Sequence, residues 1–119
     1  MTTIDLTAET FEQTVGSNNI VLVDFWASWC GPCRMFAPIY EQASATHPDV
    51  VFGKVDTEAE QALAAAARIT SIPTLMAFKS GQLVFSQPGA LPAAALEQLI
   101  DAVTRLDVEP AASPERSAT

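Results

Sequence analysis

The sequence is poor in basic residues and has no long apolar run, and each shortage excludes a class of protein. Six lysines and arginines stand against fourteen aspartates and glutamates, so the 119-residue chain carries a net charge of −8. With no basic cluster to meet phosphates, we expect neither nucleic acid nor a membrane as a partner. No apolar segment approaches the ~20 residues that cross a bilayer. The acidic start of the chain also lacks the basic and apolar regions of a signal peptide, so we expect a cytoplasmic protein.

Cysteine and histidine are equally scarce, which limits metal and disulfide chemistry. The chain has two cysteines, Cys30 and Cys33, and one histidine, His47. A structural zinc site needs about four ligands, and His47 is expected at the far end of the helix that follows the cysteines. Structural disulfides are rare in the cytoplasm. The spacing therefore favours a reversible dithiol, with zinc and a pair of inert core thiols as the alternatives.

Strand and helix patterns alternate along the chain and predict one domain with a sizeable core. Strands are predicted at residues 3–6, 20–25, 50–55, 74–78 and 83–86. Helices are predicted at residues 8–15, 33–45, 57–68 and 92–106. The early crossovers require parallel strands, and a hairpin through residues 79–82 adds antiparallel ones. The predicted fold class is α/β, a central mixed β-sheet flanked by helices on both faces.

Local signals set several of these boundaries. Pro38 lies inside the second helix and is expected to kink it. The segment Thr57–Glu60 resembles a capping box at the start of the third helix. Pro92 begins the last helix, whose buried face is expected to carry Leu96, Leu99, Ile100, Val103 and Leu106. Apolar residues then become rare, so we expect a domain over residues 1–106 and a disordered tail over residues 107–119.

The two thiols fall within one helical turn, close enough to form and break a disulfide. Cys30 is expected at the exposed, positive end of the helix dipole, which favours the thiolate that attacks other disulfides. Cys33, one turn further in and more buried, is expected to resolve the mixed disulfide. Gly31 and Pro32 between them add no positive charge near the thiolate, so the reduced form is less favoured and the protein should act as a reductant.

Asp24 is the one charged residue in the apolar segment 20–25, where a carboxylate is costly without a task or a partner. Two interpretations fit. Asp24 faces water at a strand edge, or it is a desolvated carboxyl with a raised pKa that exchanges protons with Cys33 through water. Lys54 in the following strand is a candidate partner, and an exposed position for this lysine fits the pattern equally well.

A tryptophan beside the first cysteine and a proline before the fourth predicted strand are two further features of the sequence. Trp29, beside Cys30, fits either rim packing or a contact surface. The Ile72–Pro73 bond is trans by default, because cis is only about 5% of X-Pro bonds.

With Trp-Cys-Gly-Pro-Cys-Arg at residues 29–34, set after Val-Asp-Phe-Trp at 23–26, the chain resembles the thioredoxin family. The resemblance covers about residues 4–106. It rests also on motifs that occur in the same order, namely Pro38, Lys54, Asp56, Ile72-Pro73-Thr74 and Gly89-Ala90. It implies the thioredoxin fold and a protein-disulfide reductase that cycles between a Cys30, Cys33 dithiol and a disulfide.

The resemblance also implies roles for individual residues. Asp24 is implied to be the buried proton-transfer group, with Lys54 as its neighbour in the catalytic set. Pro73 is implied to be cis and to pack against the disulfide. The implied substrate-binding surface consists of Trp29, Gly31, Pro32, Ile72, Pro73, Gly89 and Ala90. Two positions that flank this surface depart from the family pattern: Ser71 replaces a common glycine, and an aromatic residue near Arg68 is absent.

The implied partners are disulfide-containing client proteins and a flavin-containing thioredoxin reductase that supplies electrons from NADPH. No bound cofactor is needed, and we expect a monomer. Two alternative functions remain: an oxidase or isomerase on the same fold, and a binding module in a larger complex whose thiols are incidental. The Gly31–Pro32 pair and the expected cytoplasmic location argue against the first.

Overall fold

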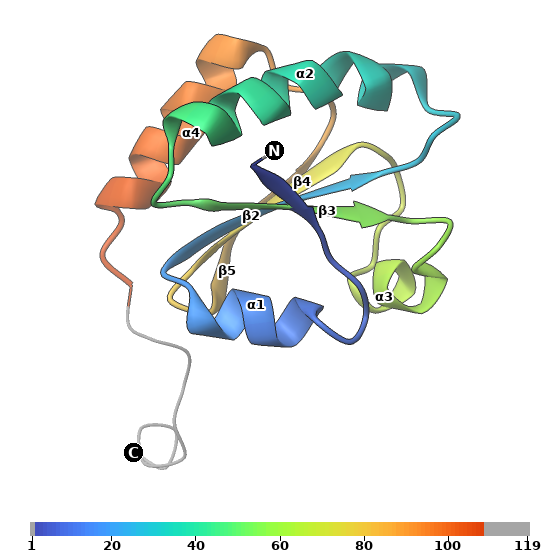
Figure 1. Ribbon diagram of the computed structural model, residues 1–119, viewed down its shortest axis with the longest axis horizontal. Coiled ribbons are helices and arrows are strands. Elements are labelled where there is room, and N and C mark those ends of the chain that lie inside the picture. The colour runs from blue at the N-terminus through green and yellow to red at the C-terminus, as the bar shows by residue number, and fades with distance from the viewer. Residues whose placement is uncertain (1, 109–119) are drawn as a thin grey trace.

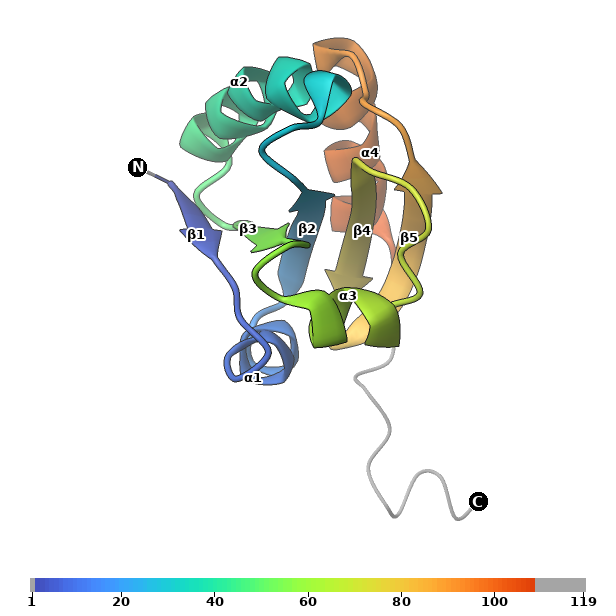
Figure 2. The same cartoon turned by 90° about the vertical axis from the view of Figure 1, so that its right-hand side faces the viewer.

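Five strands form one mixed sheet in the computed structural model, which describes residues 2–108. The strands are β1 (Thr3–Asp5), β2 (Ile20–Trp26), β3 (Val51–Asp56), β4 (Thr74–Lys79) and β5 (Gln82–Pro88). Their order across the sheet is β1-β3-β2-β4-β5, so β2 is central (Figure 2). β1 and β2 run parallel to β3, whereas β4 is antiparallel to both β2 and β5. The predicted mixed sheet with a closing hairpin is confirmed.

Four helices within residues 2–108 cover the two faces of this sheet. They are α1 (Phe11–Ser17), α2 (Gly31–Thr46), α3 (Gln61–Ala66) and α4 (Ala93–Arg105). α2 and α4 lie on one face, and α1 and α3 lie on the other (Figure 1). The α/β fold class with helices on both faces is therefore confirmed, with element boundaries that differ from the predicted ones by a few residues.

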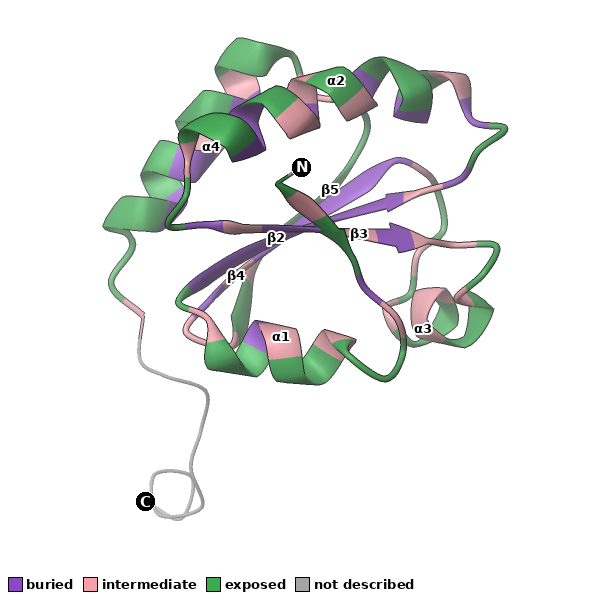
Figure 3. Cartoon of the chain, viewed as in Figure 1, coloured by how far each residue is buried: buried purple, intermediate pink, exposed green. Residues whose placement is uncertain are grey.

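Alternate side chains of β2 enter two separate cores, as the period-two direction of strand side chains requires. Leu22 packs in the core beneath α2 and α4, whereas Val21, Val23 and Phe25 pack in the core beneath α1 and α3. The strand is buried along almost its whole length (Figure 3). Asp24 therefore projects from the same face as Leu22, toward the side that α2 covers.

The third helix begins later than the sequence predicts. α3 starts at Gln61, and no side chain caps it at Glu60. The carboxylate of Asp56 instead accepts the backbone N–H groups of Glu58 and Ala59 at 2.9 and 3.4 Å. Residues 57–59 consequently form a turn after β3, and the capping-box prediction is wrong because an upstream side chain satisfies these donors.

The last helix buries a narrower face than predicted. Leu96, Ile100 and Val103 are buried, and Leu99 is half-buried. Leu106 follows the end of the helix and is 43% exposed, so its predicted place in the core is wrong. The helix ends at Arg105, one residue before the predicted limit, and its last buried residue is Val103.

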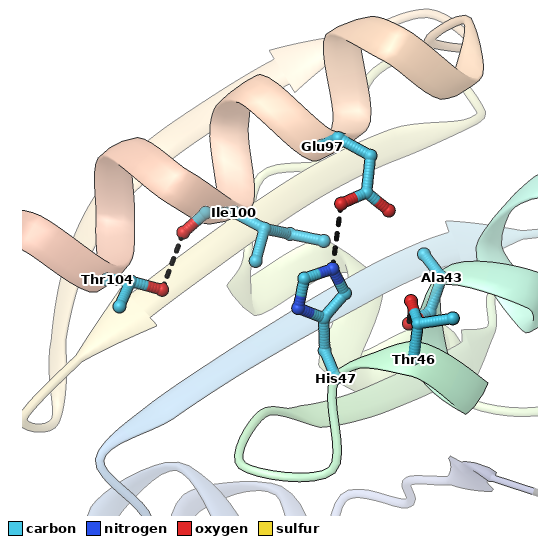
Figure 4. A network of polar contacts seen from close by, with 6 residues as sticks. All are labelled: Ala43, Thr46, His47, Glu97, Ile100 and Thr104. Atoms are coloured by element: carbon cyan, nitrogen blue, oxygen red, sulfur yellow. Dashed lines mark hydrogen bonds and ion pairs between the residues drawn. The ribbon is translucent and has the colours of Figure 1, made fainter.

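Two side chains tie α4 to the rest of the domain. The Nζ of Lys79 donates to the carbonyl oxygens of Val103 and Thr104, each at 2.9 Å, and so satisfies two of the carbonyls that a helix C-terminus leaves unpaired. The Nε2 of His47, at the C-terminal end of α2, lies 2.8 Å from the Oε1 of Glu97 (Figure 4). The first contact anchors α4 to β4, and the second links α4 to α2.

The described part of the chain ends shortly after α4. None of the helices in residues 2–108 combines the length and the apolar character needed to cross a bilayer. The predicted tail lies almost entirely outside the described residues, since only Asp107 and Val108 belong to them.

Candidate active site

The two cysteines lie where β2 leads into α2. Cys30 is the N-cap of α2, and Pro32 occupies the first turn, where the missing N–H removes no helical hydrogen bond. A turn precedes the helix, closed by the N–H of Cys30 on the carbonyl oxygen of Ala27 at 3.2 Å. Cys30 and Cys33 form a disulfide, with their Cα atoms 5.2 Å apart. The dithiol predicted from the spacing is thus assembled at a helix N-terminus.

Position on the helix, rather than exposure, distinguishes the two sulfurs. Cys30 is 4% exposed and Cys33 is 3% exposed, so the predicted exposure of Cys30 is wrong for the disulfide form. Ala27, Trp26 and Ile72 pack around both cysteines and exclude solvent. The backbone N–H of Cys33 nevertheless donates to the Sγ of Cys30 at 3.2 Å. This donor and the positive end of α2 stabilise a thiolate at Cys30.

The segment before β4 passes beside the disulfide. The Ile72–Pro73 bond is cis, as the family resemblance implies and contrary to the trans default. The carbonyl oxygen of Ile72 lies 3.8 Å from the Sγ of Cys30. The carbonyl oxygen of Pro73 accepts the N–H of Gly89 at 2.7 Å, and Gly89 has a φ of +107°, which favours glycine. The loop between β5 and α4 is thereby fixed next to the proline.

A groove opens beside the disulfide on the α3 side. The residues that line it are Trp29, Thr57, Ala64, Ile69, Thr70, Ser71 and Ile72. Trp29 is 64% exposed and forms a wall of the groove next to Cys30. Two of the residues predicted to bind substrate, Trp29 and Ile72, therefore share one concave surface.

The other predicted substrate-binding residues lie around the same end of the sheet. Gly31 and Pro32 form the first turn of α2. Pro73 and Gly89 are joined by their backbone hydrogen bond, and Ala90 is exposed directly after Gly89. The structure thus gathers these residues from three separate segments around the dithiol.

Two contacts to the active-site loop have no predicted counterpart. The Nε1 of Trp29 donates to the Oε2 of Glu58 at 2.5 Å, and the Nη1 of Arg34 donates to the carbonyl oxygen of Ser28 at 3.1 Å. The capping-box interpretation assigns Glu58 to a helix start, so the sequence gives no signal for its contact with Trp29. Glu58 thus holds Trp29, and Arg34 holds Ser28, in the loop that leads into Cys30.

Asp24 is buried, as the sharper sequence interpretation predicts. It is 1% exposed, and neither carboxylate oxygen has a hydrogen-bond partner among residues 2–108. Loss of solvent raises the pKa of Asp24 to about 7, against the opposing effect of the positive charge of Lys54. The alternative of a strand-edge carboxylate facing water is wrong. A buried carboxyl with this pKa exchanges a proton readily near neutral pH.

The neighbours of Asp24 are held by other contacts. Lys54 is its register partner across β2 and β3, and the Nζ of Lys54 lies 5.0 Å from the ring centroid of Trp26. The ammonium thus stacks on an indole and acts on the carboxyl through space. Burial, and then the charge of Asp24, raise the pKa of Tyr40, whose hydroxyl donates to the carbonyl oxygen of Gly53 at 2.8 Å.

The described residues offer no set of ligands for the zinc site that was the alternative to a dithiol. Residues 2–108 contain no group of three histidine, cysteine, aspartate or glutamate side chains suited to a metal ion. His47 is paired with Glu97 at the far end of α2. The two cysteines are bonded to each other.

Known proteins resemble this chain over most of its length. A protein-family model described as thioredoxin matches residues 2–102. A Streptomyces coelicolor protein named as a thioredoxin is 56% identical over 107 residues, which cover 90% of this chain and 80% of that protein. Thioredoxin 1 of Synechococcus elongatus is 46% identical over 98 residues, which cover 81% of this chain and 92% of that one. A solved Plasmodium falciparum thioredoxin has a TM-score of 0.77 at 39% identity, covering 84% of this chain and 97% of its own.

Proposed function

This chain belongs to the thioredoxin family and is a thiol–disulfide reductase, and we propose that Cys30 is its nucleophile and Cys33 its resolving thiol. One observation carries the assignment of roles. The N–H of Cys33 points at the Sγ of Cys30 at the N-terminus of α2, and the Cys33 sulfur has no such position. Stabilisation of the thiolate at Cys30 makes it the sulfur that attacks first.

The proposed cycle exchanges one disulfide for another and moves two electrons. The Cys30 thiolate attacks one sulfur of a client disulfide, so a mixed disulfide forms and one client thiolate leaves. The Cys33 thiolate then attacks the Cys30 sulfur and releases the second client thiolate. The client is reduced, and the chain is left with the Cys30–Cys33 disulfide. The two cysteine sulfurs are oxidised as the two client sulfurs are reduced, so the exchange balances without a bound cofactor.

We propose that Asp24 accepts the proton that the Cys33 thiol loses when it becomes a thiolate. The carboxyl is buried on the face of the sheet that α2 covers and has a pKa of about 7, so it can accept a proton at neutral pH. Its oxygens lack protein partners among the described residues, which leaves them free to accept the proton through water. Lys54 is assigned a tuning role, because its charge keeps the pKa of Asp24 from rising further.

Partners and location complete the proposal. Client disulfides are proposed to bind across Trp29, Gly31, Pro32, Ile72, Pro73, Gly89 and Ala90, the residues gathered around the dithiol. The electrons are proposed to come from NADPH through a flavin-containing thioredoxin reductase. The family match supports action on disulfide-containing proteins, and we propose that the chain works as a monomer in the cytoplasm.

The reduction potential tests the direction of electron flow. Equilibration of the protein with glutathione buffers should give about −270 mV, the value typical of thioredoxins, because Gly31 and Pro32 add no charge that stabilises the reduced form. A Pro32→His variant places a cation beside the thiolate and should raise the potential by roughly 30 mV or more. A wild-type value near −120 mV, typical of a strong oxidant, contradicts a reductase role.

Truncation tests the domain boundary. We propose that residues 1–106 form the catalytic domain, since every residue assigned to the site lies between Asp24 and Ala90. A chain that stops after Leu106 should therefore reduce insulin at the full-length rate, within about twofold, because the truncation removes no residue assigned to the site. The melting temperatures of the two chains provide the control. A large loss of activity at unchanged stability shows that the segment after Leu106 takes part in client binding.

A further inference from the structure

We propose that Glu58 is a positioning residue that holds the Trp29 indole in place as one wall of the client groove. The inference rests on the proposed function, because it concerns the groove beside the same dithiol. Trp29 directly precedes Cys30 and lines this groove. Its Nε1 donates to the Oε2 of Glu58 at 2.5 Å, a hydrogen bond to a charged acceptor.

The turn that carries Glu58 is itself fixed. The carboxylate of Asp56 accepts the N–H of Glu58 at 2.9 Å. The N–H and the hydroxyl of Thr57 both donate to the carbonyl oxygen of Trp26, at 2.9 and 3.0 Å. Because Trp26 ends β2 and leads into the active-site loop, the acceptor for the indole is anchored to the same strand end as the dithiol. Glu58 can thus act as a rigid support.

Trp29 needs such a support because most of its side-chain surface faces solvent. The indole is 64% exposed, so a loss of the bond to Glu58 lets it leave the wall of the groove. A client segment that binds there must then order the indole again. Ordering one such side chain on binding costs about two- to tenfold in affinity. The hydrogen bond to Glu58 orders the indole before a client binds, so that binding does not have to order it.

Attraction between the Glu58 charge and basic client residues is the competing explanation. The two explanations predict different results when Glu58 is replaced by a residue that is uncharged but can still accept a hydrogen bond. Glu58→Gln removes the charge and keeps a carbonyl oxygen that can accept the indole proton, whereas Glu58→Leu removes both at similar size. Positioning predicts that Gln is tolerated and Leu is not, and charge attraction predicts equal losses.

The test compares wild type, Glu58→Gln and Glu58→Leu in the reduced state, with two disulfides under single-turnover conditions. For insulin, a protein disulfide, the Leu variant should react about two- to tenfold more slowly than wild type, and the Gln variant within about twofold of it. For 5,5′-dithiobis(2-nitrobenzoate), which is too small to span the groove, all three should react alike. The Trp29 indole N–H should exchange with solvent faster in the Leu variant when followed by NMR.

Three kinetic results overturn the proposal: equal insulin rates for the Leu variant and wild type, equal losses for the Gln and Leu variants, or equal losses on both disulfides. A fourth is an NMR result, namely that the Trp29 indole N–H of reduced wild type shows no protection from exchange with solvent. A Glu58→Ala variant replaces Leu if thermal unfolding shows that the Leu protein is destabilised. Failure of the proposed function is distinct, since wild type itself would then reduce neither disulfide.

Discussion

Cys30→Ser should abolish disulfide reduction, with a fall of at least about 10³-fold, because the serine hydroxyl is a weak nucleophile at neutral pH. Cys33→Ser should still attack client disulfides and then stop. Without the second thiol the mixed disulfide between Cys30 and the client cannot be resolved. Non-reducing electrophoresis and mass spectrometry of each variant after reaction with insulin will measure the adduct.

The expected asymmetry tests the assignment of roles sharply, because the two sulfurs are equally buried in the disulfide form. Only the N-cap position and the N–H of Cys33 favour Cys30 as the nucleophile. The variant with serine at both positions is the control for non-covalent association. Adduct formation by Cys30→Ser and not by Cys33→Ser reverses the assignment.

Asp24→Asn should make the protein more stable at pH 8 than wild type. The folded pKa of about 7 lies above the ordinary aspartate pKa of 3.8, so the native state holds this proton more tightly than the unfolded chain does. The stability that Asp24 contributes is therefore greatest below pH 4 and falls as the pH rises to about 7. At about 1.4 kcal/mol per pKa unit, the ionised carboxylate costs at most about 4 kcal/mol. Asparagine has no such cost.

Thermal unfolding from pH 3 to 9 measures this difference. The melting temperatures of wild type and Asp24→Asn should converge below pH 4 and separate up to pH 7, at roughly 4 °C for each kcal/mol. Asp49→Asn, which removes an exposed carboxylate, is the matched control and should show no such separation. A lower melting temperature for Asp24→Asn at pH 8 would mean that the ionised carboxylate is a stabilising structural group.

The same variant should slow the release of client by roughly 10²-fold, the typical contribution of a general base. In wild type the rate of resolution should rise with pH through about 7, and in Asp24→Asn this inflection should disappear. Lys54→Met removes the charge that lowers the pKa of Asp24 and should move the inflection to higher pH. An unchanged profile in Asp24→Asn contradicts a proton-transfer role.

Periodic patterns explain why most of the fold could be predicted from the sequence. The apolar run of β2 indicates a strand buried on both faces, and its side chains pack in two cores. The i, i+4 spacing of Phe36 and Tyr40 in α2 indicates one buried helix face, and both residues pack in the core beneath that helix. Asp24 could be identified because a carboxylate in such a strand contradicts the pattern around it. The dithiol could be identified from the spacing of the two cysteines together with the scarcity of other metal ligands.

Features that depend on distant segments could not be predicted. Cys30 is buried because Ile72, from the loop before β4, packs over a helix start that is otherwise open. Glu58 contacts Trp29 across 29 positions of sequence, and its turn forms because Asp56 takes the donors that a capping box would use. The contacts of Ile72 and Glu58 join distant segments, whereas the Asp56 turn is a local alternative that replaces the capping box.

The most direct test of the account is NADPH oxidation in the presence of insulin, a thioredoxin reductase from the same organism and this protein. We predict that NADPH is consumed at a rate proportional to the concentration of the protein, with insulin as the final acceptor. The variant with serine at both Cys30 and Cys33 should support no consumption. Equal consumption with that variant, or none with the wild-type chain, contradicts a dithiol that carries electrons from the reductase to client disulfides.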